Sequence, residues 1–197
     1  MNPKSKFRQI CLWIGVLAAI AFCVTFQVVV VPTASMERTV MVGDHLLVNR
    51  LSFRWKHVQR GEVISFVPPR QKNLVYLKRV IAVGGDHVES RGDQIFVNGA
   101  PLQESYAQYL CHGCTEKTIS LIVPPHELFV LGDNRDRSED SRNWGTVSEK
   151  NVVGTPVMVL WSFAVPTDRW QTRSAAAIYF DHPLNHLRWA RFMRSVQ

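Results

Sequence analysis

An apolar run without charged side chains, Ile10 to Val31, constrains the fold of this 197-residue chain more than any other feature. None of its 22 residues is charged, and Thr25 and Gln27 are the most polar of them. A helix rises about 1.5 Å per residue, so this stretch is long enough to cross a hydrocarbon layer about 30 Å thick. We therefore predict a transmembrane helix over residues 10–31, preceded by a short N-terminal segment over residues 1–9.

A cleaved secretory signal is the alternative explanation of the apolar stretch. Such signals have apolar regions of about 7–15 residues, followed by a cleavage site between small residues. This stretch is longer, and the next recognisable motif follows it without such a site. We therefore expect a retained, single-pass anchor. Lys4, Lys6 and Arg8 precede it, so the positive-inside rule predicts a cytoplasmic N-terminus and an extracytoplasmic domain over residues 32–197.

The charge and composition of the chain exclude several functional classes. Apolar residues make up 46% of the sequence, which is enough for a packed core, and the formal net charge is +7. Such a charge suits nucleic acid or an anionic membrane, but the cationic residues are scattered except at the two chain ends. No zinc-finger or helix-turn-helix pattern is present. We expect no nucleic-acid partner, no cofactor, and a monomer that contacts the lipid bilayer.

The four cysteines bear on metal binding and on the redox compartment. Cys11 and Cys23 lie in the apolar stretch, whereas Cys111 and Cys114 form a Cys-His-Gly-Cys sequence. A structural zinc site needs four ligands, and histidines would have to complete this single pair, so we expect no metal. In an oxidising compartment the pair is expected to form a short-loop disulfide. It would lie in a polar, irregular surface insertion over residues 101–118.

Short segments with strand-like patterns dominate the part after the apolar stretch. Residues 74–83 form a nearly continuous apolar run, which is typical of a strand buried on both faces. Asn98-Gly99 is a hairpin-turn dipeptide. The other strand segments are 45–49, 62–67, 94–97, 119–123, 128–131 and 152–163. The sequence therefore predicts a mainly β outer domain of bent antiparallel sheets or a partial barrel, with one N-terminal transmembrane helix.

The segment 184–197 combines arginines with large apolar side chains. It suits a basic amphipathic helix that lies near the membrane. It suits a terminal helix packed on the domain equally well, and both alternatives stay open at this point.

Lys78 is the first candidate for catalysis, because it lies inside the most apolar strand of the outer domain. A lysine buried there must be paired or neutral, and desolvation lowers the pKa of its amine. A neutral amine can act as a general base. The alternative is an edge strand from which Lys78 and Arg79 reach solvent.

Ser35 is the second candidate. It lies four residues beyond the apolar stretch, between Ala34 and Met36, in a segment without an evident helix or strand pattern. A nucleophile on a loop beside a small residue leaves room for a substrate backbone. The chain has 13 serines, however, and most are expected at the surface or at caps. Taken singly, Ser35 and Lys78 each have an ordinary structural explanation.

A 14-residue segment from Gly132 to Gly145 favours a catalytic role for both residues. It contains Gly-Asp-Asn at residues 132–134 and Ser-Glu-Asp-Ser-Arg-Asn-Trp-Gly at residues 138–145. Together with the serine loop after the anchor and the Tyr-Leu-Lys-Arg strand at 76–79, it closely resembles the type I signal peptidases of bacteria and organelles. Residues 60–63, Arg-Gly-Glu-Val, resemble a further strand of that family.

The resemblance implies a dyad in which Ser35 is the nucleophile and Lys78 is the general base. It implies an oxyanion hole made by the Ser35 backbone N–H and the Thr33 hydroxyl, and a Ser138 side chain that orients the Lys78 amine. Gly132 would allow close backbone approach. The supporting salt-bridge group would be Arg79, Asp140 and Arg142, and the pocket for small substrate residues would be lined by Met36, Tyr76 and Leu77.

The implied function is removal of N-terminal signal peptides from exported preproteins, after small residues, by a serine endopeptidase of the bacterial inner membrane. Its catalytic domain would lie on the periplasmic side. The family's serine loop is usually Ser-Met-x-Pro-Thr-Leu, whereas Arg38 replaces the proline here. This departure leaves open a specialised peptidase of pilin maturation or conjugation with the same chemistry.

Two further alternatives belong to other functional classes. A self-cleaving repressor also uses serine and lysine, but it would need a DNA-binding domain where this chain has its apolar stretch. A non-enzymatic, membrane-tethered β-domain that binds a partner would have an exposed Lys78 with an ordinary pKa.

Overall fold

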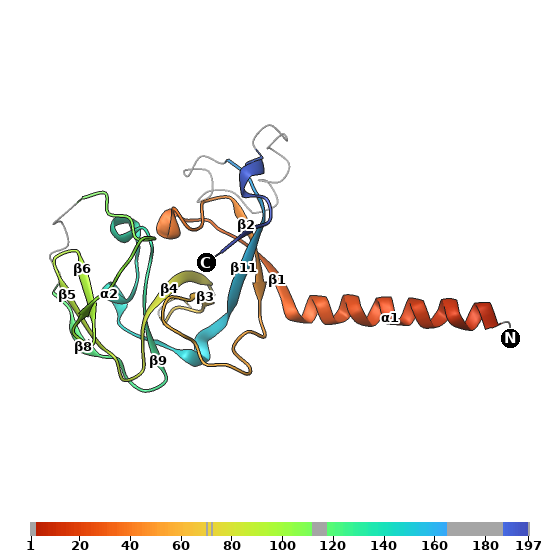
Figure 1. Ribbon diagram of the computed structural model, residues 1–197, viewed down its shortest axis with the longest axis horizontal. Coiled ribbons are helices and arrows are strands. Elements are labelled where there is room, and N and C mark those ends of the chain that lie inside the picture. The colour runs from red at the N-terminus through yellow and green to blue at the C-terminus, as the bar shows by residue number, and fades with distance from the viewer. Residues whose placement is uncertain (1–2, 70, 72, 112–117, 165–186, 197) are drawn as a thin grey trace.

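The computed structural model describes residues 3–69, 71, 73–111, 118–164 and 187–196. A single long helix, α1 (Pro3–Thr25), projects away from a body made mainly of strands (Figure 1). Residues Lys6–Thr25 of α1 are long and apolar enough to cross a membrane, and none of that span is buried against the protein. Trp13, for example, is 64% exposed. The mainly β body and the N-terminal apolar helix were both predicted.

The boundaries of the predicted membrane helix need correction. The helix ends at Thr25, and the next five residues form strand β1 (Phe26–Val30), which pairs antiparallel with β2 (Asp44–Asn49). The run of valines from 28 to 31 explains the change, because β-branched side chains favour strands over helices. The anchor therefore leads directly into the sheet rather than ending at residue 31.

The larger sheet has eight antiparallel strands and curls into a partial barrel, as predicted. Its order is β1-β2-β11-β3-β4-β9-β10, and β12 pairs with β11. Register shifts within β11 and β4 mark bulges, which bend strands and increase their twist. The remaining strands of this sheet are β3 (Val63–Phe66), β4 (Tyr76–Val83), β9 (Glu127–Leu131), β10 (Val147–Ser148), β11 (Val152–Ser162) and β12 (Arg194–Ser195).

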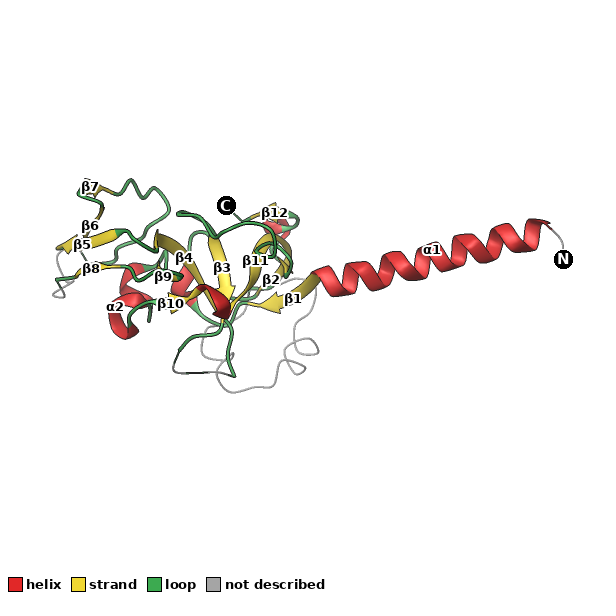
Figure 2. Cartoon of the chain, turned by 90° about the horizontal axis from the view of Figure 1, so that it is seen from below, coloured by secondary structure: helices red, strands yellow, loops and turns green. Residues whose placement is uncertain are grey.

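A smaller four-stranded sheet lies at the end of the body away from α1 (Figure 2). Its order is β7-β6-β5-β8. The predicted turn at Asn98-Gly99 connects β6 to β7, and both residues have positive φ, 53° and 78°. The strands are β5 (His87–Arg91), β6 (Gln94–Val97), β7 (Ala100–Pro101) and β8 (Ser120–Ile122).

Short helical turns connect the strands near the predicted catalytic segments. They are η1 (Ala34–Met36), η2 (Arg135–Arg137), α2 (Ser141–Trp144), η3 (Glu149–Asn151) and η6 (Trp189–Arg191). An apolar cluster, which includes Met36 of η1, packs against this turn. It contains Val31, Met36, Val40, Leu46, Val48, Val63, Val159 and Val196.

The described part of the predicted surface insertion makes specific side-chain contacts with the rest of the domain. Glu104 forms a buried ion pair with Arg135, and the Tyr106 ring lies 4.0 Å from the Arg79 guanidinium carbon. The described part of this stretch therefore packs on the Gly132–Gly145 segment. Cys111 is disulfide-bonded, whereas Cys114 lies outside the described residues, so their pairing stays a prediction.

The described end of the chain, residues 187–196, packs on the domain. It forms the turn η6 and strand β12 rather than an amphipathic helix, and Arg191 and Val196 are buried. Of the two alternatives, packing on the domain is therefore the one that these residues follow, although they do not form the regular helix that was predicted. Residues 184–186 and 197 lie outside the described part of the chain.

Candidate active site

Ser35 lies in η1, a single 3₁₀ turn between β1 and β2. Two bonds from Asn134 hold this turn. The Asn134 backbone N–H donates to Ser35 O at 3.1 Å, and the Asn134 side-chain amide donates to Ala34 O at 3.1 Å. Ser35 is 8% exposed, so its hydroxyl is fixed and almost covered by protein.

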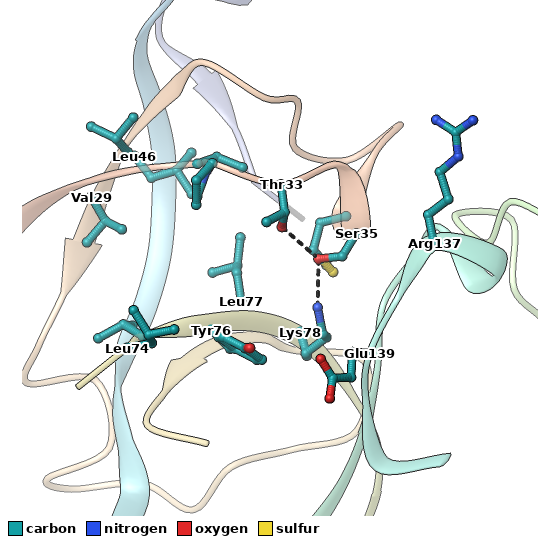
Figure 3. A pocket seen from close by; sticks show the side chains of 15 residues that line it. Val29, Thr33, Ser35, Leu46, Leu74, Tyr76, Leu77, Lys78, Arg137 and Glu139 are labelled. Carbon is teal, nitrogen blue, oxygen red and sulfur yellow. Dashed lines mark hydrogen bonds between the residues drawn. The ribbon is translucent and has the colours of Figure 1, made fainter. Parts of the chain in front are cut away.

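Lys78 faces Ser35 from the third residue of β4. Its Nζ lies 2.6 Å from Ser35 Oγ, and its side chain is only 3% exposed (Figure 3). Burial lowers the pKa of the Lys78 amine from 10.5 to about 8, although the carboxylates of Asp140 and Asp133 favour the charged form. Lys78 therefore does not reach solvent, as the edge-strand alternative requires, and the amine is positioned to take the hydroxyl proton.

Thr33 lies on the other side of Ser35 from Lys78. Its hydroxyl is 3.4 Å from Ser35 Oγ. No acceptor among the described residues takes up the Ser35 backbone N–H. The two donors of the predicted oxyanion hole, the Ser35 backbone N–H and the Thr33 hydroxyl, therefore both lie near Ser35 Oγ.

An apolar pocket of about 320 Å³ opens beside these three side chains. One wall comes from β1 and the residues after it, and the other comes from residues 74–78 (Figure 3). All three predicted pocket residues, Met36, Tyr76 and Leu77, line it. The other lining residues are Val29, Val30, Val31, Pro32, Thr33, Ser35, Leu46, Leu74, Val75, Lys78, Arg137 and Glu139.

Comparison with known proteins agrees with this geometry. A family model described as "Signal peptidase, peptidase S26" matches residues 5–161. The chain belongs to the signal peptidase family. A signal peptidase I of Leptolyngbya laminosa is 35% identical over 140 residues, 66% of this chain and 66% of that protein. Signal peptidase IB of Staphylococcus aureus is 32% identical over 80% of this chain and 92% of its own length.

One solved structure is also similar to this chain. It is a signal peptidase I of Enterococcus faecalis, 35% identical, with a TM-score of 0.45, covering 51% of this chain and 97% of its own. The match to the signal peptidase family model runs from within α1 to near the end of β11. It includes Ser35, Lys78 and the whole Gly132–Gly145 segment, whereas residues 187–196 lie beyond it.

Ser138 differs from the role that the signal peptidase resemblance implies. Its Oγ is buried and has no hydrogen-bond partner among the described residues, so the expected bond to the Lys78 amine is absent. Lys78 Nζ instead donates to Ser35 Oγ. Ser138 packs over Gly132, where an added Cβ would lie 2.2 Å from Ser138 Oγ and 2.5 Å from Ser35 O. Gly132 therefore has the predicted close approach, and the orienting role of Ser138 stays a prediction.

The predicted supporting salt-bridge group divides into two separate pairs. Arg142 binds Asp140 at 2.8 and 2.9 Å, and Asp140 also caps α2 and accepts from the Gly132 N–H at 3.0 Å. Arg79 instead binds Asp133 at 2.8 and 2.9 Å. Consecutive residues of a strand point to opposite faces, so Arg79 cannot share a side with Lys78. Arg79 therefore supports the serine loop through Asp133, which also accepts from Thr39 Oγ1.

Three supports of the serine loop were not assigned from the sequence. Asp133 and Asn134 stand in the Gly-Asp-Asn motif that the signal peptidases share, so that motif was a usable signal. The third is a buried ion pair in which Arg191 Nε donates to Asp44 Oδ1 at 2.9 Å, while Arg191 Nη2 also reaches Thr39 O at 3.2 Å. Arg191 and Asp44 are 147 residues apart, and nothing in the sequence pattern joins them.

Arg38 stands where signal peptidases usually have proline, and its backbone explains why proline is absent. Its φ is +85°, in the left-handed region that favours glycine, whereas a proline ring fixes φ near −65°. The exposed Arg38 side chain contacts Ala107 O at 3.4 Å. The serine loop here therefore takes a turn that the usual proline cannot form.

Proposed function

We propose that this chain is a membrane-anchored serine endopeptidase that removes signal peptides from preproteins, with Ser35 as nucleophile and Lys78 as general base. The observation that carries the proposal is the 2.6 Å contact between Lys78 Nζ and Ser35 Oγ at the mouth of an apolar pocket. The two relatives named above are both signal peptidases I, which supports the general export role over a specialised pilin or conjugation peptidase.

The proposed reaction passes one proton through Lys78. Neutral Lys78 takes the proton of Ser35 Oγ while that oxygen bonds to the scissile carbonyl carbon. The carbonyl oxygen becomes an oxyanion, which the Ser35 N–H and the Thr33 hydroxyl stabilise by hydrogen bonds. The C–N bond then breaks, and the leaving amine takes the proton from Lys78. Lys78 then takes a proton from a water that attacks the acyl ester, and it gives this proton to Ser35 Oγ as the ester bond breaks.

The walls of the pocket support binding of an extended peptide. Among the described strands, β1 is the end of its sheet path and pairs with β2 alone, and its residues Val29 and Val30 line the pocket. Residues 76–78 of β4 pair with β3, whereas pairing with β9 begins at Arg79. A substrate strand can therefore hydrogen-bond to one or both free edges. The apolar lining near Ser35 suits small apolar side chains, as in the Ala-x-Ala end of signal peptides.

The proposed location is the bacterial inner membrane, with one span and the β domain on the extracytoplasmic side. The exposed apolar surface of α1 supports the span, and the lysines and arginine near its start support a cytoplasmic N-terminus. A membrane-impermeant maleimide should label Arg91→Cys in intact cells but Lys6→Cys only after permeabilisation. The reverse pattern would exclude this orientation.

The test of the proposed function is cleavage of a model preprotein by the purified full chain in detergent micelles. Mass spectrometry of the product should give one new N-terminus, directly after an Ala-x-Ala sequence. Replacing the last alanine of that sequence by leucine should abolish the cut at that position. Cleavage at unrelated sites, or cleavage that tolerates the leucine, would contradict the proposal.

A further inference from the structure

A hollow of about 760 Å³ opens between α1 and the loop that follows β2. One wall consists of Ala19, Ile20, Cys23 and Val24 of α1, and the other residues that line the hollow are Arg50, Leu51, Arg54, Val152 and Val153. The loop begins beside the end of the helix, because the Arg50 N–H donates to Thr25 O at 2.8 Å. Residues 50–57 are called the basic loop below.

The hollow lies at a definite depth along α1. If Thr25 marks the end of the span Lys6–Thr25, then Ala19 lies about 9 Å deeper, at about 1.5 Å per residue. The headgroup layer of a bilayer is roughly 5–8 Å thick on each side of the hydrocarbon core. The basic loop is therefore held where headgroups meet the hydrocarbon.

The charge of the hollow fits an anionic ligand. Arg50 and Arg54 are both exposed, and neither forms an ion pair with any residue that the structure describes. No acidic residue lines the hollow in the described part of the chain. Lys56 differs, because its charge is paired with Glu62. Two unpaired guanidinium groups are well suited to bind phosphate oxygens by paired hydrogen bonds.

Trp55 gives an independent indication of a membrane interface. It is 82% exposed, the highest exposure of any large apolar side chain among the described residues. Tryptophan is enriched at membrane–water interfaces, where its ring lies at headgroup level and its N–H meets water. An exposed tryptophan that directly follows Arg54, in a loop that begins beside an apolar helix with no buried residue in its span, matches that environment.

We propose that the basic loop binds the headgroups of anionic phospholipids, with Arg50 and Arg54 on the phosphates and Trp55 in the interface. The inference rests on the proposed membrane span of α1 but not on the catalytic dyad. It gives the β body a second attachment to the bilayer besides α1. That attachment fixes the height of the substrate pocket above the membrane.

Fluorescence quenching by brominated lipids tests the proposal with the full chain in bilayers. Bilayers contain brominated phosphatidylglycerol or brominated phosphatidylcholine, and the Trp55 signal is the difference between wild type and Trp55→Phe. We expect stronger quenching of Trp55 in phosphatidylglycerol. The double variant Arg50→Gln/Arg54→Gln should lose that difference, and high salt should reduce it in the wild type.

Two controls make the outcome decisive. Arg91→Gln removes one charge on β5, in the sheet at the end of the body away from α1, and should keep the lipid difference (Figure 1). Trp13, measured against Trp13→Phe, reports on the span and should be quenched in both lipids. Equal Trp55 quenching in both lipids, or a preference that survives the double variant, would overturn the headgroup site. Unquenched Trp13 would instead overturn the membrane span itself.

Discussion

The amine of Lys78 occupies a position where a positive charge is costly. Lowering its pKa from 10.5 to about 8 corresponds to about 3 kcal/mol, at roughly 1.36 kcal/mol per pKa unit. The bond to Ser35 Oγ uses one side of the amine, and the apolar pocket covers part of the rest. The proposed reaction accounts for this cost, because it needs a neutral amine as its base.

The first prediction concerns pH. Below about pH 8 the Lys78 amine is protonated and cannot accept the Ser35 proton, so kcat/KM for preprotein cleavage should rise about tenfold per pH unit up to about pH 8 and then level off. The unfolded chain keeps this proton up to about pH 10.5, so the contribution of Lys78 to folding stability should also rise between pH 8 and 10.5. A rate that is flat or falling from pH 6 to 8 would exclude Lys78 as the base.

The second prediction concerns Arg38. Because its φ is +85°, Arg38→Gly should keep or slightly raise stability, whereas Arg38→Pro should destabilise the serine loop by about 1–3 kcal/mol and lower activity. Thermal unfolding and preprotein cleavage measure the two effects. If Arg38→Pro cleaved faster than wild type, the left-handed turn at Arg38 would not be the active conformation.

At the scale of elements, alternation and turn chemistry were enough to predict most strands. The Asn98-Gly99 hairpin and the buried strand around Lys78 appear as expected. The end of the anchor was not predictable from hydropathy, because the strand β1 is as apolar as the helix before it. The valines favour a strand, but the pairing with β2 is what shows where the helix ends and the sheet begins. Pairing depends on contacts distant in sequence, which a local pattern does not contain.

The same limit applies to the supports of the serine loop. The motif Gly132–Gly145 predicted which segment lies near Ser35. The prediction that Arg79 joins Asp140 and Arg142 in one salt-bridge group was wrong, because Arg79 pairs with Asp133 and that choice depends on how the segment folds. The Arg191–Asp44 pair joins the described end of the chain to the serine loop. Nothing in the sequence pattern indicated that this ion pair supports the serine loop.

The third prediction tests this pair. Arg191→Met leaves the Asp44 carboxylate buried without its partner, and breaking a buried ion pair in this way typically costs about 3–5 kcal/mol. The midpoint of thermal unfolding should therefore fall, and kcat should fall more than KM rises because the serine loop is displaced. Arg194→Met is the matched control, since Arg194 is three residues away and exposed. Equal effects of the two variants would show that the pair does not position the loop.

At the scale of the whole molecule, the chain consists of an uncovered apolar helix and a β body that holds the reactive groups (Figure 1). Strand β1 connects the two parts, and Ser35 follows it after four residues. The proposed nucleophile is therefore close in sequence to the point where the helix enters the body. This arrangement suits a substrate that is itself tethered in the bilayer by an apolar segment.

Cleavage of a model preprotein by matched dyad variants tests the central claim most directly. Ser35→Ala, Lys78→Ala and Lys78→Arg should each reduce the rate at least about 1,000-fold while the thermal unfolding midpoint stays within a few degrees of wild type or higher. Lys78→Arg should fail because arginine cannot become neutral. If folded Lys78→Ala kept more than a tenth of the wild-type rate, the Ser35–Lys78 dyad would be wrong.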